Sequence, residues 1–462
     1  MDLFTIVQLL QSLWVAFIVI MLFYRFRIGV ASYLAYIFLV PYMKIDIEGF
    51  VLQWNFINIL LLIAFLYYRY KKKLLKFDWC PLLPFVIYFG VSLIVMPFQD
   101  GLPFSESINT WRVQVMKYLI LPFVIWNDII INHNSLKLYR KVLIGCIVIA
   151  TLYGLFLTTM PGVNPYVMVV SEVNGEGFNM AYAAGHSGMV DDGTLDDDMI
   201  IDEDIVFRND NPIVEDRLFG RISSVFSHPM MFGLFLGLAL LYLYRNKGNI
   251  SKRLLYVMSL IILTDMLLCG VRSVIVATSV VGLFYLFYLR KFKIFFTFLM
   301  IGGALWIITT FSPWLSNYLG SIFDEGSSNV SGSSLEMRLS QLEGCFVEIK
   351  DAFLEGKGFG WVGYYLSQNE GHPTILHFES LIFVVICNSG MVGVLLWFVM
   401  GTIILKYNNR RIRPIAALLH SLFIFYIAYA CITGEYGYMQ YFIIFYILML
   451  GEDLYMKRAN SI

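Results

Sequence analysis

Charged residues are scarce in this sequence. Lys, Arg, Asp and Glu make up 14% of the 462 residues, and hydrophobic residues make up 59%. Soluble globular domains carry about 25% charged and about 45–50% apolar residues, so the composition excludes an ordinary soluble domain and predicts an integral membrane protein. The 33 basic and 33 acidic residues leave no net charge. This balance argues against nucleic acid as a partner, because binding to the phosphate backbone requires an excess of positive charge.

Cysteine is also rare. Of the six cysteines, Cys345 lies in an expected loop, and the other five lie within apolar runs: Cys80, Cys146, Cys269, Cys387 and Cys431. This spacing provides neither a disulfide framework nor a set of metal ligands, and we expect neither a metal nor a cofactor.

Two further features are missing. We find no internal repeat and no inverted symmetry between halves, which argues against a secondary transporter. The N-terminus, MDLFTIVQLL, has no basic segment and no small-residue cleavage site. We therefore expect a retained helix at this position rather than a removed signal peptide.

Long apolar runs are abundant. A membrane-spanning helix needs about 20 predominantly apolar residues, and a chain with this many runs is expected to be an all-α polytopic membrane protein with about 12–13 transmembrane helices. We expect residues 1–462 to form a single membrane domain. The runs are 4–24, 28–43, 50–70, 80–97, 112–131, 141–160, 222–244, 254–270, 272–289, 294–311, 375–405, 415–433 and 436–450.

Basic clusters recur at every second connection between these runs. Short loops rich in Lys and Arg face the cytoplasm, so this pattern predicts an N-terminus outside and a C-terminus inside. If one of the early runs does not span, the N-terminus is inside and the later assignments are unchanged. The clusters are Arg25/Arg27, Arg69 to Lys73, Lys137 to Lys141, Arg245 to Arg253, Arg290 to Lys293, Lys406 to Arg413 and Lys457/Arg458.

The opposite connections are external, and two of them are long. Residues 160–220 form a strongly acidic loop that contains DDGTLDDDMIIDED (191–204). Its aspartates match no calcium-binding loop, so we expect this segment to be solvated and to shield or orient a partner. Residues 312–374 form the second loop, in which Leu335, Leu339, Leu342 and Phe346 recur at helical spacing. This pattern predicts an amphipathic external helix over residues 335–352.

One arginine lies inside an almost wholly apolar stretch, LLCGVRSVIVATSVVGLFY (267–285). A charge at bilayer depth costs roughly 2.5–3.5 kcal/mol on insertion scales, so Arg272 needs a position or a role that explains it. The topology places Arg272 at an outer turn between two helices. It is there either as a helix-end anchor whose head group reaches water or as a cation for an anionic substrate.

Other polar residues are predicted to share this outer face. They are Arg221 and His228 before the helix that follows the first loop, Arg338 in the external helix, and His372, His377 and Glu379 where the chain re-enters the membrane. Arginine suits bidentate contact with phosphate oxygens, and a carboxylate or imidazole can take a proton from a hydroxyl. The alternatives are structural: the arginines are anchors, His228 caps a helix, His372 is a loop residue, and Glu379 is an acid tolerated at a helix start.

Four segments resemble, in order, the motifs of the O-antigen polymerase and O-antigen ligase superfamily of bacterial polysaccharide assembly. They are RISSVFSHPMMFG, VRSVIVATSVVG, EMRLSQLEGCFVEIKDAFLEGKGFG and HFESLIFVVICNSGMVGVLLW, which together span residues 219–397. The resemblance implies a metal-independent, GT-C-like inverting glycosyltransferase. Its donor would be an undecaprenyl-pyrophosphate-linked glycan at the periplasmic face of the bacterial inner membrane.

The resemblance also implies roles for individual residues. Arg221 and Arg272 would bind the pyrophosphate, Arg338 matches the loop arginine, and Glu379 or His377 would be the general base. We assign His228 and His372 to substrate binding because they lie on the same face.

One departure separates two subfamilies. Ligases usually carry a His-Asn pair about eleven residues before the first glycine of the G-x-x-G motif, and this chain has Glu379-Ser380 there. This pair resembles the polymerases, unless His377 is the displaced imidazole. The motif proline is also followed by Met230 where the family has asparagine.

These residues predict a polymerase that joins lipid-linked repeat units into O-antigen, capsule or exopolysaccharide. Its partners would be the lipid-linked glycan, the lipid membrane and a chain-length regulator protein. The alternatives are a ligase that transfers glycan to lipid A core of lipopolysaccharide or another acceptor, and a transporter of lipid-linked sugars.

Overall fold

The structure is a computed structural model of the chain. It describes residues 3–40, 44–47, 50–74, 76–160, 164–174, 222–297, 299–300, 303, 335–369, 371–435 and 437–459. The acidic stretch 191–204, Arg221 and most of the apolar run 294–311 lie outside the described residues.

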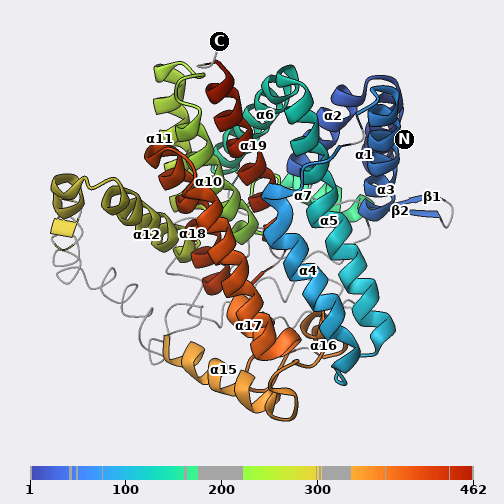
Figure 1. The fold of residues 1–462 in the computed structure, drawn as a ribbon, viewed down its shortest axis with the longest axis vertical. Helices are drawn as coiled ribbons and strands as arrows, with labels where there is room; N and C mark the ends of the chain where they lie inside the picture. The colour runs from blue at the N-terminus through green and yellow to red at the C-terminus, as the bar shows by residue number, and fades with distance from the viewer. Residues whose placement is uncertain are drawn as a thin grey trace.

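Helices account for almost all of the regular structure in these residues (Figure 1). The first half contains α1 (Leu3–Tyr24), α2 (Phe26–Leu39), α3 (Trp54–Lys71), α4 (Leu83–Val95), α5 (Phe104–Ile131), α6 (His133–Leu157) and α7 (Pro165–Asn174). The second half contains α10 (Pro229–Arg245), α11 (Lys252–Leu268), α12 (Arg272–Tyr288), α15 (Leu335–Glu348), α16 (Trp361–Gln368), α17 (Leu381–Asn408), α18 (Arg413–Thr433) and α19 (Tyr438–Ala459). Single 3-10 turns flank α4 at Cys80–Leu82 and Met96–Phe98, and one follows α15 at Lys350–Ala352.

Six of the described helical segments are long and apolar enough to cross a membrane. They are Thr5–Tyr24, Cys80–Phe98, Phe104–Ile131, Asn134–Leu157, Leu381–Asn408 and Arg413–Thr433. Three shorter apolar helices, α2, α10 and α12, accompany them. The predicted helical membrane protein is confirmed at this level. The expected number of about 12–13 spans stays a prediction, although every expected apolar run outside 294–311 overlaps a helix.

The helical prediction was wrong at one place. The runs 28–43 and 50–70 were expected to be helical to their ends, but α2 ends at Leu39, and β1 (Lys44–Ile47) pairs antiparallel with β2 (Phe50–Gln53). The register pairs Ile47 with Phe50 and Lys44 with Gln53. The alternation of polar and apolar residues in KIDI is a strand pattern that the hydropathy of the flanking runs conceals.

The helix α19 forms the centre of the bundle. Residues 438–450 are all buried, and the helix packs against α5, α6, α10 and α18. A helix that is apolar all round requires such a position. Near it, α10 and α18 approach closely at Gly237, where a Cβ atom would lie 1.9 Å from the ring of Phe425.

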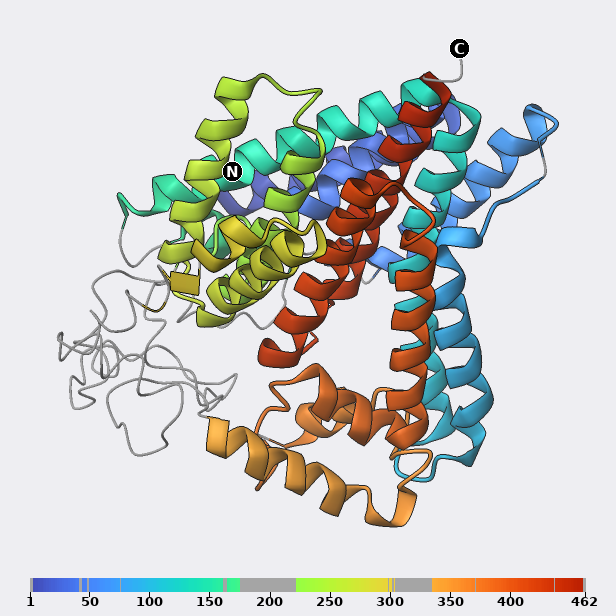
Figure 2. The same ribbon diagram turned by 60° about the vertical axis from the view of Figure 1, so that its left-hand side comes forward.

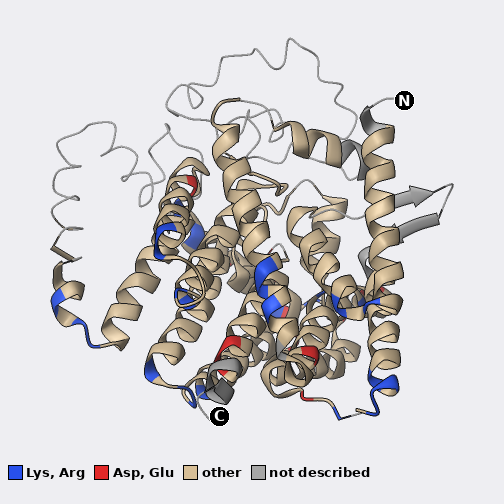
Figure 3. Ribbon diagram, turned by 90° about the horizontal axis from the view of Figure 1, so that it is seen from above, with Lys and Arg blue, Asp and Glu red and all other residues tan. Residues whose placement is uncertain are grey.

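The two ends of the bundle differ in charge. Arg69 and Lys71 end α3, Arg245 ends α10 and Lys406 lies in the last turn of α17. Seen from above, several helix ends carry the blue of Lys and Arg (Figure 3). The helices α15 and α16 lie at the other end, away from the C-terminus (Figures 1 and 2). We call the end that holds α15 and α16 the outer end.

Candidate functional site

The outer ends of four helices meet at one place. Arg413, at the start of α18, donates from Nε to the Tyr288 carbonyl at the end of α12 over 3.0 Å, so the two helices are antiparallel. At the other end of α18, the Tyr429 hydroxyl donates to the Met230 carbonyl of α10 over 2.6 Å. Ser380, before α17, donates from Oγ to the Cys431 carbonyl over 2.8 Å. The starts of α10, α12 and α17 therefore surround the end of α18.

Arg272 is the first residue of α12 and is half-buried. It follows Gly270, whose φ of 64° turns the chain after α11. The start of a helix carries a partial positive charge, which disfavours a cation and favours an anion. A guanidinium at this position therefore adds to the helix end in attracting a negatively charged group.

The segment after the first long loop reaches the same turn. The Ile222 amide donates to the Leu268 carbonyl at the end of α11 over 3.3 Å. His228 is the N-cap of α10, and its Nδ1 accepts a hydrogen bond from the Met230 amide over 3.0 Å. Pro229 occupies the first helical position, which tolerates proline. His228 thus fixes the start of α10, with Nδ1 engaged in that cap.

Arg338 of α15 binds Glu379, two residues before the start of α17. Its Nη1 donates to the Glu379 carbonyl over 3.0 Å, and its Nη2 lies 3.8 Å from the Glu379 Oε2. The two side chains are 22% and 28% exposed. The two predicted site residues are therefore brought together, and Arg338 orients Glu379. His377 is half-buried nearby, with its ring 3.5 Å from the position that a Cβ on Gly371 would take.

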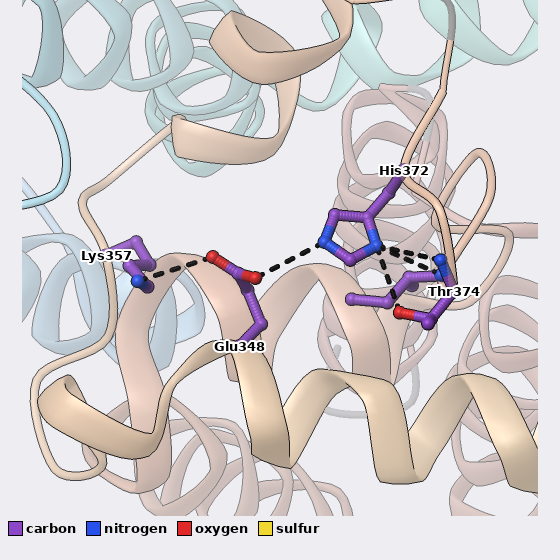
Figure 4. A network of polar contacts seen from close by, with 5 residues as sticks. Glu348, Lys357, His372 and Thr374 are labelled. Atoms are coloured by element: carbon purple, nitrogen blue, oxygen red, sulfur yellow. Dashed lines mark hydrogen bonds and ion pairs between the residues drawn. The ribbon is translucent and has the colours of Figure 1, made fainter.

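A second polar network lies at the outer end of the bundle. Glu348 lies between Lys357 and His372 (Figure 4). Its Oε1 is 3.3 Å from the Lys357 Nζ, and its Oε2 is 3.3 Å from the His372 Nε2. The His372 Nδ1 accepts hydrogen bonds from the amides of Thr374 and Ile375 over 3.2 and 3.1 Å. Since Nδ1 accepts, the proton lies on Nε2, which donates to Glu348. Both nitrogens of His372 are thus engaged in holding the turn 372–376 against α15.

A glycine-rich loop, residues 353–360, forms backbone hydrogen bonds to α17 on both sides of a break in that helix. Gly390 has φ 57° and ψ −154°, and the helix is interrupted there. The amides of Met391 and Val392 donate to the carbonyls of Phe353 and Leu354 over 3.1 and 3.0 Å. In return, the amides of Lys357 and Gly358 donate to the carbonyls of Cys387 and Asn388 over 2.9 and 3.1 Å. Unpaired backbone groups are costly at membrane depth, so the loop compensates for the break.

Glu435 is the main polar residue to which the sequence gave no role. It lies between α18 and α19, where its Oε2 accepts from the Tyr426 hydroxyl over 2.9 Å and its Oε1 accepts from the Met439 amide over 3.0 Å. Burial raises the pKa of the Glu435 carboxyl to about 7, although those hydrogen bonds and the charge of Lys117 oppose the shift. A carboxyl with such a pKa can exchange a proton at neutral pH. Its only sequence signal is an acid between two glycines, in TGEYG.

An apolar cavity of about 440 Å³ lies beside the segment that precedes α10, which contributes Val225 to its wall. Its walls include Leu10 of α1, Ile149 of α6, Tyr166 of α7 and Val225. Leu10 and Ile149 on these walls are exposed rather than buried. A 150 Å³ apolar cavity holds one benzene; by that measure this cavity has room for roughly 18 carbon atoms.

The predicted site residues thus fall into three groups. Arg272 and His228 lie on elements that meet at the outer end of α18. Glu379 precedes the start of α17 at this place and is bound by Arg338 of α15, with His377 two residues before Glu379. His372 belongs to the network with Glu348. Arg221 lies outside the described residues. Within the described ranges, no group of three or more His, Cys, Asp or Glu side chains is placed to hold a metal ion. No protein-family model matches the chain, and no curated protein matches it.

Proposed function

We propose that this protein is a glycosyltransferase that polymerises undecaprenyl-pyrophosphate-linked oligosaccharide repeat units at the periplasmic face of the bacterial inner membrane. The observation that carries the proposal is the position of Arg272. It begins α12 at the outer end, where the starts of α10 and α17 and the end of α18 converge. Together with the sequence resemblance, this position supports a site for a lipid diphosphate.

In the proposed reaction, the hydroxyl oxygen of one lipid-linked unit attacks the anomeric carbon of the growing glycan. A new glycosidic bond forms, the bond to the pyrophosphate breaks, and the lipid pyrophosphate leaves. Arg272, with Arg221, stabilises the charge that develops on the leaving group. A single displacement inverts the configuration of the anomeric carbon.

The hydroxyl proton passes to a side chain at the same outer end. The sequence resemblance assigns this role to Glu379 or His377. Glu435 joins them as a candidate because its raised pKa, about 7, suits proton transfer at neutral pH. Glu379 is also oriented by Arg338, which would place its carboxylate for an incoming hydroxyl.

The apolar cavity supports a lipid substrate. Its 440 Å³ volume would hold several isoprene units, and Val225 on its wall lies three residues after Ile222, which bonds to the end of α11. A chain in the cavity and a diphosphate at Arg272 would then belong to one amphiphilic donor.

The primary test uses the full-length protein in proteoliposomes with lipid-linked repeat units. We expect Arg272→Ala to lower the formation of longer lipid-linked glycan at least 100-fold. The matched control is Lys291→Ala, which removes an exposed cation just beyond the other end of α12 and should leave the rate unchanged. Wild-type polymer from the folded Arg272→Ala variant would refute the diphosphate site.

The same assay separates the alternatives. Longer lipid-linked glycan from purified protein indicates a polymerase, whereas product on added lipid A core indicates a ligase. Flipped but chemically unchanged substrate indicates a transporter. Glu379→Gln, His377→Ala and Glu435→Gln test the proton acceptor, and a variant that keeps the wild-type rate removes its residue from the chemistry.

A further inference from the structure

Two cysteines that are distant in sequence meet between α15 and α17. Cys345 of α15 and Cys387 of α17 are both fully buried. They belong to one apolar cluster, with Ile349, Phe383 and Ile386 among its members. The two side chains are in hydrogen-bonding contact, and both are free thiols in this structure.

The surroundings suit a covalent bond between these sulfur atoms. A disulfide requires Cα atoms about 4.4–6.8 Å apart and side chains that point toward each other. Several Cα atoms of α15 lie within 8 Å of Cα atoms of α17, and Cys345 and Cys387 belong to the apolar cluster between these helices. The backbone hydrogen bonds between the glycine-rich loop and α17 also hold the end of α15 close to α17.

The two cysteines lie on the side of the membrane where disulfides form. The pair lies at the outer end, away from the basic helix ends that mark the cytoplasmic side (Figures 1 and 2). The periplasm is kept oxidising by thiol–disulfide oxidoreductases, whereas the cytosol keeps thiols reduced. Two thiols in contact on the outer side are therefore exposed to oxidation while the chain folds.

We infer that Cys345 and Cys387 form a disulfide that joins α15 to α17. The oxidant is the disulfide of a periplasmic oxidoreductase. One cysteine loses its proton, and its thiolate attacks that disulfide to give a mixed disulfide. The second cysteine, as a thiolate, then attacks the sulfur of the first. The Cys345–Cys387 bond forms, the bond to the oxidoreductase breaks, and the oxidoreductase leaves as a dithiol that carries the two electrons and recovers two protons.

The timing follows from burial. Both sulfur atoms are inaccessible once α15 has packed on α17, so the exchange takes place before or during that packing. The closed loop contains the glycine-rich loop, α16, the turn at His372 and Glu379. The bond therefore fixes the segment that positions Glu379 relative to α17, and it does so whether or not the protein transfers sugars.

The test uses the full-length protein in its native membranes and needs no activity measurement. Denaturing solubilisation in N-ethylmaleimide blocks every free thiol, and proteolysis without reductant followed by mass spectrometry reveals linked peptides. We expect the peptides of Cys345 and Cys387 to be joined and the buried Cys146 of α6 to carry the maleimide. Maleimide on both Cys345 and Cys387 would overturn the inference.

A variant guards against an accidental pairing. In Cys345→Ser, we expect Cys387 to react with the maleimide. A new disulfide from Cys387 to another cysteine in this variant would show that the wild-type link arose by indiscriminate oxidation, and it would equally overturn the inference. Expression in a host without the periplasmic oxidoreductase should lower the linked fraction at least several-fold, and an unchanged fraction there would refute the proposed route of oxidation.

Discussion

Replacing Gly390 by alanine should strongly destabilise the outer end of the bundle. The residue has φ 57° and ψ −154°, a backbone conformation that side chains other than glycine rarely adopt. An added Cβ would lie 2.5 Å from the Leu354 carbonyl oxygen and 2.7 Å from the Gly356 amide nitrogen. Both contacts are with backbone, so neither can be relieved by rotating a side chain.

The magnitude follows from two contributions. Forcing alanine into a sparsely populated conformation costs about 1–3 kcal/mol. Relieving the clash separates the loop from α17 and loses the hydrogen bonds of Met391 and Val392 to residues 353 and 354, each worth about 0.5–1.5 kcal/mol net. We therefore expect Gly390→Ala to lower the free energy of unfolding of this region by about 2–6 kcal/mol.

The assay is thermal denaturation of detergent-solubilised protein, followed by size-exclusion chromatography of a fluorescent fusion. The matched control is Gly363→Ala in α16, where an added Cβ meets nothing within 4 Å and alanine favours the helix. We expect a lower apparent Tm for Gly390→Ala only. Equal Tm values for the two variants would refute the reasoning that the break in α17 is held by the loop.

Two further predictions concern charged groups. Because folding raises the pKa of Glu435 from 4.5 to about 7, its protonated form is favoured in the folded state; the wild type should lose stability as pH rises from about 4.5 through 7. Glu435→Gln should reduce this loss in melting curves at pH 5 and pH 8, and parallel curves would contradict the shift. At the other end of the bundle, Asp453→Ala should cost about 3–5 kcal/mol, because it leaves the charge of Arg411 buried; these side chains are 1% and 10% exposed. Glu348→Gln breaks its pair with the partly exposed Lys357 and should cost at most about 1 kcal/mol. A lower Tm for Glu348→Gln than for Asp453→Ala would rule out this explanation.

The helices and their order could be predicted from the sequence because hydropathy alone identifies membrane helices. The amphipathic helix over 335–352 was also predictable, and α15 with its following 3-10 turn covers that range. The hairpin at residues 44–53 was missed because it lies between two apolar runs and contributes little to their average hydropathy.

The contacts at the outer end were less accessible. The sequence placed Arg338 and Glu379 on one face, but their pairing depends on how α15 crosses the start of α17, which no local pattern specifies. No role was predicted for Glu435, because its raised pKa arises from burial among helices that lie apart along the chain. The contact between Cys345 and Cys387 joins segments about 40 residues apart in the sequence. At this separation, the spacing of two cysteines does not predict whether they lie together in the fold.

The break in α17 has a consequence for the order in which the chain is built. Residues 353–358 precede α17, yet they can bond to it only after reaching the outer surface and folding there. Until then, only a continuous helix pairs the amides of Met391 and Val392 within the lipid. We therefore expect Gly390 to enter the bilayer in a straight helix and to bend when the loop packs against it. On this expectation the bend is a late event of assembly, and its presence in a newly made molecule would report that the preceding segment has been translocated.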